Sequence, residues 1–312
     1  MAAESRAALR IGIDLGGTKT EAILMDTDSR ILARERLPTP HEDYQGQVAT
    51  IAELVRRMET EAGQRELPVG IGHPGAVIPA TGLMKNANSL CLNGQPLKAD
   101  IERALGRSVR MANDADCLAV SEATDGAAAG ATCVFAVILG TGVGGGVVIN
   151  GQLRQGPNGI AGEWGHNPLP WPRTDWDEVP GPRHWDGQFG SLEAYLSGPG
   201  LAAAHARETG LQRSGFEIVA AAAAGEAAAE HSLQRYEHRL ARALAVVINI
   251  LDPDVIVLGG GLSKLTRLYT QVPQQWGQWV FSKDIVTRLV PAQHGDSSGV
   301  RGAAWLWPAA AG

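Results

Sequence analysis

The stretch from Ile11 to Thr20 joins an apolar segment to a carboxylate, two glycines and a Thr-Lys-Thr turn. Glycine lets backbone N–H groups come close to an anion, and the hydroxyl and ammonium groups that follow add donors and positive charge. The candidate phosphate-binding residues are Gly16, Gly17, Thr18 and Lys19. Asp14 stands where it could hold a magnesium ion beside those phosphates. Taken alone, the stretch could equally be an ordinary Gly-Gly turn.

The residues after this turn favour a β-hairpin over a phosphate-binding loop of the Walker type. The residue that follows Gly17 is threonine, where the Walker pattern requires lysine. The apolar run Ala22–Met25 comes next and predicts a second strand, whereas the Walker pattern continues into a helix.

Two further glycine clusters follow apolar segments. The first contains Gly140, Thr141 and Gly142, and with Gly145 it matches the dinucleotide pattern G-x-G-x-x-G. That pattern requires a helix next, but a strand and a turn follow here, so a second glycine hairpin in contact with phosphate fits better. Gly260 and Gly261 form a third turn, of the kind that lets a flat base lie against backbone. Three such clusters favour nucleotide binding.

Asn113 and Asp114 lie between a predicted strand and a predicted helix. Both residue types are preferred helix N-caps, which would explain the pair without any chemistry. The functional alternative makes Asp114 a base at the floor of a cleft, where it accepts a proton from a hydroxyl that attacks phosphorus.

Glu163 and His166 lie three residues apart, so a turn or short helix could direct both toward one cavity and its sugar hydroxyls. A Glu-x-x-His pair is more often a surface pair or a core histidine. Glu193 joins this neighbourhood only if the fold brings it back.

The composition favours a globular protein of two lobes. The chain has 312 residues, of which 44% are hydrophobic and 19% are charged, and its net charge is −6. It has no run of lysine and arginine, so we expect neither nucleic acid nor a membrane as a partner. No apolar run approaches the roughly 20 residues that span a bilayer. The three scattered cysteines suggest reduced thiols and a cytoplasmic location.

The order of predicted elements indicates an α/β fold with mixed sheets. Three strands, a helix over residues 44–62 and a further strand come first. A second block begins near Asn113 and repeats the strand–glycine loop–strand unit, with residues 140–146 as its loop. The segment 167–190 is rich in Pro, Trp, Asp and Gly and predicts an ordered functional loop whose tryptophans could simply pack it down. Residues 192–251 are mostly helical by their pattern.

Together these motifs resemble the ROK family of bacterial sugar kinases. The likeness extends over nearly the whole chain and includes the segments 14–19, 85–89, 112–115, 140–142, 162–166 and 252–261. Within the family the fructokinases are most similar, through the segments 86–89, 118–123, 167–171 and 294–307.

The resemblance implies a two-lobed actin-like or hexokinase-like ATPase fold, built from ribonuclease H-like lobes with a cleft between them. The small lobe would comprise residues 1–112 plus about 296–312, and the large lobe residues 113–295. Asp114 would be the general base on the 6-hydroxyl of the sugar. The sugar site would be lined by Gly75, Asn88, Asn113, Glu163, His166 and Glu193.

The resemblance also implies ATP and Mg²⁺ as cofactors. Asp14 would take the magnesium. The glycine hairpins named above would hold the phosphates, with Gly260 and Gly261 near the adenosine. The implied activity is that of an ATP-dependent fructokinase and the implied assembly is a homodimer. The alternatives are a glucokinase, a mannokinase or an N-acetylhexosamine kinase, or a sugar sensor without catalysis. Few residues precede Ile11, so we expect no DNA-binding helix-turn-helix of the family's repressors.

One segment departs from the family. ROK kinases usually hold zinc with this histidine, His166, and three cysteines, but the corresponding run here is His184 to Ser191 and contains no cysteine. His184 and Asp186 are capable zinc ligands and Ser191 is a poor one. Either a His/His/Asp site replaces the thiolates, or the metal is lost. We favour loss, because thiolates supply much of the affinity for zinc.

Overall fold

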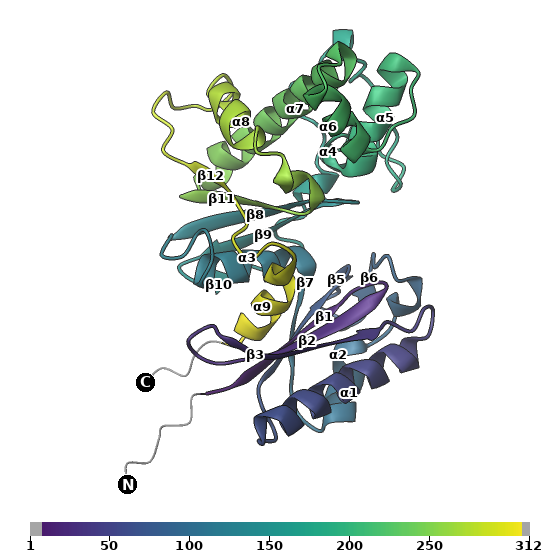
Figure 1. Cartoon of the computed structure of the whole chain (residues 1–312), viewed down its shortest axis with the longest axis vertical. Helices are drawn as coiled ribbons and strands as arrows, with labels where there is room; N and C mark the ends of the chain where they lie inside the picture. Colours follow the sequence, from purple (N-terminus) through teal and green to yellow (C-terminus); the bar gives the residue numbers. More distant parts are fainter. Residues whose placement is uncertain (1–7, 308–312) are drawn as a thin grey trace.

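The computed structural model describes residues 8–307 and contains two five-stranded mixed sheets (Figure 1). In the first sheet β1 (Arg10–Leu15), β2 (Lys19–Met25) and β3 (Ile31–Pro38) form an antiparallel meander. Two further strands, β4 (Val69–His73) and β7 (Arg110–Asn113), extend it in parallel with β1. The three predicted N-terminal strands are therefore confirmed.

The second sheet repeats this arrangement. β8 (Cys133–Leu139) and β9 (Val143–Ile149) form a hairpin, to which the short β10 (Gln152–Leu153) adds one more antiparallel strand. On the other side β11 (Val255–Gly259) and β12 (Arg288–Pro291) run parallel to β8. The mixed sheets and the two related halves agree with the sequence analysis.

We call the first sheet and its helices the small lobe. Its helix α1 (Tyr44–Ala62) begins where Asp43 caps the N–H of Gly46, and it ends at Gly63, whose φ of 59° suits glycine. A face at helical spacing, which includes Val48, Ile51 and Val55, is buried against the sheet. Next to α1 lies α2 (Leu97–Leu105), while β5 (Ala76–Val77) and β6 (Met84–Lys85) form a separate small hairpin.

We call the second sheet, with the helices that cover its outer face, the large lobe. These helices are α4 (Leu192–Leu196), α5 (Gly198–Thr209), α6 (Gly215–Ala223), α7 (Ala227–Leu251) and α8 (Leu268–Trp276). They bury one contiguous core that includes Trp164, Tyr195 and Tyr236. The predicted helical character of residues 192–251 is confirmed.

Two helices lie between the sheets (Figure 1). The first, α3 (Asp114–Thr124), packs on β8 and β9, while α9 (Ser298–Trp305) packs on β1 and β4, and the two helices contact each other. Their contact is made by backbone, since a Cβ on Gly302 would lie 1.7 Å from the carbonyl oxygen of Cys117. The C-terminal helix therefore joins the lobes, and the lobe boundaries given above stay a prediction.

The predicted glycine loop over residues 140–146 is shorter than expected, because β9 already begins at Val143. The later glycines belong to the strand and allow close packing. A Cβ on Gly146 would lie 2.6 Å from the backbone oxygen of Ala115 in α3, and one on Gly145 would lie 2.8 Å from that of Gly162. Only residues 140–142 form the turn, in which the Gly140 N–H donates to the Gly142 carbonyl at 3.0 Å.

Within residues 8–307, no helix combines the length and the hydrophobicity needed to cross a bilayer. The three cysteines, Cys91, Cys117 and Cys133, are all unpaired.

The helix contact gives a stability prediction. Gly302→Ala places a methyl group inside the van der Waals radius of the Cys117 carbonyl. We expect a loss of about 3 kcal/mol or more in the free energy of unfolding, since overpacked sites cost about 1–3 kcal/mol and backbone cannot move aside as a side chain can. Urea denaturation followed by circular dichroism measures it.

Gly277→Ala is the matched control, because Gly277 has a negative φ and its Cβ would lie 3.6 Å from Ile285, an ordinary contact. We expect this variant to stay within about 1 kcal/mol of the wild type. Equal stability of the two variants would contradict the proposed role of the contact.

Candidate active site

A cavity of about 870 Å³ opens between the two lobes. It brings together every residue predicted to line the sugar site, namely Gly75, Asn88, Asn113, Glu163, His166 and Glu193. Asp114, Thr141 and Gly142 line the same cavity. Segments more than one hundred residues apart in the sequence thus meet around one space with both polar and apolar walls, large enough for a hexose.

Asp114 is the first residue of α3, at the floor of this cavity. The capping role falls to Asn113, whose side-chain oxygen accepts the N–H of Asp116 at 2.6 Å. One Asp114 oxygen accepts the N–H of Ala115 at 2.9 Å. Desolvation raises the pKa of Asp114 even though the backbone N–H groups of Ala115 and of Asp114 itself oppose the shift. The side chain of Asp114 is nevertheless accessible from the cavity, and an accessible carboxylate with a raised pKa is suited to accept a proton.

The β1–β2 hairpin has the form expected of a phosphate-binding turn. Its Gly16 N–H donates to the Lys19 carbonyl at 3.1 Å, and its tip is exposed at Gly17 and Thr18. Thr39, which follows β3, stabilises the turn, because its hydroxyl donates to the Gly16 carbonyl at 2.8 Å. The chain therefore forms a hairpin here, as predicted, and the backbone at its tip is open to an anion.

Asp14 lies at the end of β1, just before this turn. Its pKa is raised to about 6, first by burial and then by the charges of Asp114 and Glu21. A carboxylate that is costly to ionise alone gains stability once a cation neutralises it. A single carboxylate at this place is compatible with a magnesium ion that keeps most of its water ligands.

A second cavity of about 620 Å³ lies beside the β8–β9 turn and has mainly apolar walls. Its lining includes Gly140, Thr141, Pro199, Ala202, Phe216, Val219, Gly261, Leu262 and Lys264. Gly260, with a φ of 82°, turns the chain from β11 into the short helix Gly261–Lys264 that forms one wall. The size and hydrophobicity of this cavity suit a flat heteroaromatic base. Thr141 lines both cavities, so it lies where a nucleotide would meet the sugar site.

Glu163 and His166 lie on a short helical turn, Trp164–His166, as predicted. The turn is fixed to β9 by Trp164, whose indole N–H donates to the Gly144 carbonyl at 3.0 Å. Burial raises the pKa of Glu163, while the charge of His166 acts in the opposite direction.

Glu193, at the start of α4, is brought to the cavity wall. Its Oε2 accepts the N–H of Val143 at 2.8 Å, and its Oε1 faces His184 Nε2 at 2.8 Å and the indole N–H of Trp185 at 3.1 Å. Burial opposes ionisation, but these partners together lower the pKa of Glu193. This carboxylate is ionised and fixed in orientation before any ligand binds.

The segment from His184 to Ser191, which contains no cysteine, contributes to a cluster of side chains of the types that bind metals. Ligand atoms of His166, His184 and Asp186 all lie within 4.8 Å of one another. Asp186 lies between the imidazoles, 3.2 Å from Nδ1 of His166 and 3.0 Å from Nδ1 of His184. The Ser191 hydroxyl is instead occupied as the N-cap of α4, where it accepts the Ala194 N–H.

Three side chains meet here, and they offer nitrogen and oxygen donors. A structural zinc site has four ligands, and the resemblance to the family implies that three of these would be thiolates. Asp186 is already paired with both imidazoles: the Gln188 N–H, then the two imidazoles, lower the pKa of Asp186 to about 2. The group thus does not fit the zinc site of the family, and we assign no step to a metal at this place. The loss of the metal stays a prediction.

Several residues around the cavity escaped the sequence analysis. Lys85, Asn86 and Ile160 line it, and Trp185 does so with 65% of its surface exposed instead of packing the loop down. Asp116 is buried next to Asp114, and its pKa is raised to about 7 by burial and by the charges of Glu163 and Asp114. The sequence signal that could have drawn attention to Asp116 is that a second aspartate stands two positions after Asp114.

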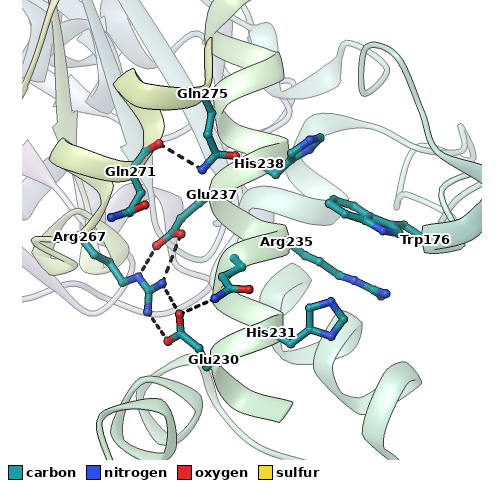
Figure 2. Close-up of a pocket in the computed structure, with 10 residues that line it drawn as sticks. Trp176, Glu230, His231, Arg235, Glu237, His238, Arg267, Gln271 and Gln275 are labelled. Carbon is teal, nitrogen blue, oxygen red and sulfur yellow. Dashed lines mark hydrogen bonds and ion pairs between the residues drawn. The ribbon is translucent and has the colours of Figure 1, made fainter. Parts of the chain in front are cut away.

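Another cavity, of about 480 Å³, lies between α7 and α8 (Figure 2). It is polar, but both arginines that line it already have carboxylate partners. Arg267 donates to Glu230 at 2.7 Å and also contacts Glu237, and Arg235 lies 3.2 Å from Glu208. We therefore assign the candidate active site to the cleft between the lobes.

Asp116 gives a pH-dependent prediction. The pKa of Asp116 is about 7 in the folded protein and about 3.8 in the unfolded chain, so folding favours the protonated carboxyl. The stability that this protonated carboxyl contributes is fully present below pH 3.8 and is lost as the pH rises through about 7. Asp116→Asn removes this dependence. We expect the variant to gain about 1–3 kcal/mol relative to the wild type between pH 5 and pH 8. Denaturant titrations at both pH values measure this difference, and parallel changes in the two proteins would refute it.

Known proteins of this architecture match the chain over nearly its full length. A model of the ROK family matches residues 10–310. The N-acetyl-D-glucosamine kinase of Vibrio parahaemolyticus is 38% identical over 298 residues, which are 95% of this chain and 98% of that protein.

Two solved structures share the fold. The ROK hexokinase of Thermus thermophilus has a TM-score of 0.84 and 31% identity, over 95% of this chain and 96% of that one. The ROK glucokinase of Streptomyces griseus, in complex with glucose and AMPPNP, has a TM-score of 0.75 and 30% identity, over 96% of this chain and 98% of that one. These likenesses confirm the hexokinase-like fold. The chain belongs to the ROK family.

Proposed function

We propose that the protein is an ATP-dependent hexose kinase that phosphorylates the 6-hydroxyl of its sugar. The observation that supports this most directly is the pair of adjoining cavities. One is lined by carboxylate and amide side chains, Asp114 among them, the other is apolar with the size of a base, and Thr141 lines both. The S. griseus relative holds glucose and an ATP analogue together in the same fold.

The proposed transfer requires positioning more than covalent chemistry. Glu163, His166 and Glu193 would hold sugar hydroxyls and direct the 6-hydroxyl toward Asp114. Asp114 would accept the hydroxyl proton as the oxygen attacks the γ-phosphate. The N–H groups of the two glycine hairpins would stabilise negative charge on the phosphates. Magnesium, held by Asp14, would supply further charge neutralisation.

The names of the relatives favour N-acetyl-D-glucosamine as the substrate. The V. parahaemolyticus kinase shares 38% identity over nearly the whole chain, and kinases of the same name from related bacteria are equally similar. We therefore place N-acetyl-D-glucosamine ahead of the fructose that the sequence motifs implied. D-Fructose stays the second candidate, on the likeness of the segments 86–89 and 294–307 to fructokinases.

A substrate panel tests this proposal. We expect ADP release with N-acetyl-D-glucosamine at a kcat/KM at least tenfold above that with D-fructose, D-mannose, D-glucose or N-acetyl-D-mannosamine. A coupled spectrophotometric assay measures it. The reverse order for fructose would select the second candidate. No turnover with any of these sugars would leave the protein a sugar sensor and end the kinase proposal.

Asp114→Asn tests the base. We expect kcat to fall by about 10²–10⁴, the usual contribution of general base catalysis, while the sugar still binds. Calorimetric titration with the preferred sugar follows binding. Asp28→Asn is the control, since Asp28 lies in the turn after β2 with 70% of its side chain exposed. Unchanged turnover in the Asp114 variant would exclude the role.

A further inference from the structure

We infer that Trp185 is a sugar-contacting residue of the cleft between the lobes and that it determines substrate specificity. This inference rests on the proposed function, because it names a further residue of the same sugar site. Trp185 has no counterpart among the residues that the family resemblance implied.

The position of Trp185 is well defined. It lies at the tip of a closed turn, in which the His184 N–H donates to the Gln188 carbonyl at 2.8 Å and the Gly187 N–H to the His184 carbonyl at 3.0 Å. Residues Arg183 and Phe189 pair as a β-bridge below this tip. The turn therefore holds the indole at one place, where it lines the cavity between the lobes.

The indole is fixed by its polar end. Its N–H donates to Glu193 Oε1 at 3.1 Å, and His184 Nε2 lies 2.8 Å from the same oxygen. The ring also stands perpendicular to the imidazole of His166, with 5.5 Å between centroids. Trp185 is thus in contact with two of the side chains proposed to hold the sugar.

The apolar part of the ring remains available. Trp185 keeps 65% of its surface exposed, whereas Trp164, on the neighbouring turn, keeps 5%. An exposed indole beside a fixed carboxylate matches the chemistry of a pyranose: the carboxylate accepts hydroxyl protons, and the aromatic face packs against the C–H face of the sugar ring. A flat aldohexopyranose gains from this more than a sugar whose ring presents axial hydroxyls on that face.

The test separates the two parts of the side chain. Trp185→Phe keeps an aromatic ring and removes the N–H donor, while Trp185→Ala removes both. We expect the KM for N-acetyl-D-glucosamine to rise about three- to fivefold in the first variant and at least tenfold in the second. The KM for ATP should stay within twofold and kcat within about threefold, because Asp114 and the phosphate hairpins are not touched.

Trp171→Phe and Trp171→Ala are the matched controls. Trp171 belongs to the same loop, has 48% of its surface exposed and packs near Trp279, away from the cavity. These variants should have the KM of the wild type for both substrates.

Binding without turnover gives a second measurement. Adding N-acetyl-D-glucosamine, or D-fructose, to the protein without ATP should change the tryptophan fluorescence of the wild type, and this change should be absent in Trp185→Phe. Unchanged sugar KM in Trp185→Ala, with an active wild type, would overturn this inference alone. A wild type that neither binds nor phosphorylates these sugars would overturn it together with the proposed function.

Discussion

The backbone contact between α3 and α9 is the constraint on which the arrangement of the molecule depends. Gly302 lies directly against the Cys117 carbonyl, and Gly70 of β4 lies as close to the Ala303 carbonyl on the other side of α9. Buried Glu122 secures the same place, since its two oxygens accept three backbone N–H groups and the Ser298 hydroxyl. Sheet, helix, helix and sheet therefore form one continuous stack. Asp114 begins one of those helices, so its position relative to the β1–β2 and β8–β9 hairpins follows from this packing.

The two sheets contain equivalent hairpins. Each begins with an antiparallel hairpin whose glycine-containing tip is open to an anion, the first at Gly16 and the second at Gly140. The small lobe adds carboxylate charge through Asp14, whereas the large lobe adds the apolar cavity. A nucleotide with a charged and an apolar end is complementary to this division, which supports the proposal of ATP without depending on any one residue.

Local patterns predicted much of this correctly. The strand and hairpin at Asp14, the helix over residues 44–62 and the cap at Asn113 each depend on a few neighbouring residues, so the sequence alone reveals them. The resemblance to a family added the grouping of Glu163 with Glu193. The failures were contacts between distant segments. Gly145 looks like a loop residue until Gly162 packs against it, and neither the burial of Asp116 nor the exposure of Trp185 has a local signal.

The absence of sulfur from the segment that leads to Glu193 has a chemical consequence. Metal sites built on cysteine are open to oxidants, which convert thiolates to sulfenic acids or disulfides and release the ion. The segment from Asn167 to Glu193 contains neither cysteine nor methionine, and His184 and Trp185 hold the Glu193 carboxylate through N–H groups. Peroxide therefore has no sulfur to modify in this wall of the cleft.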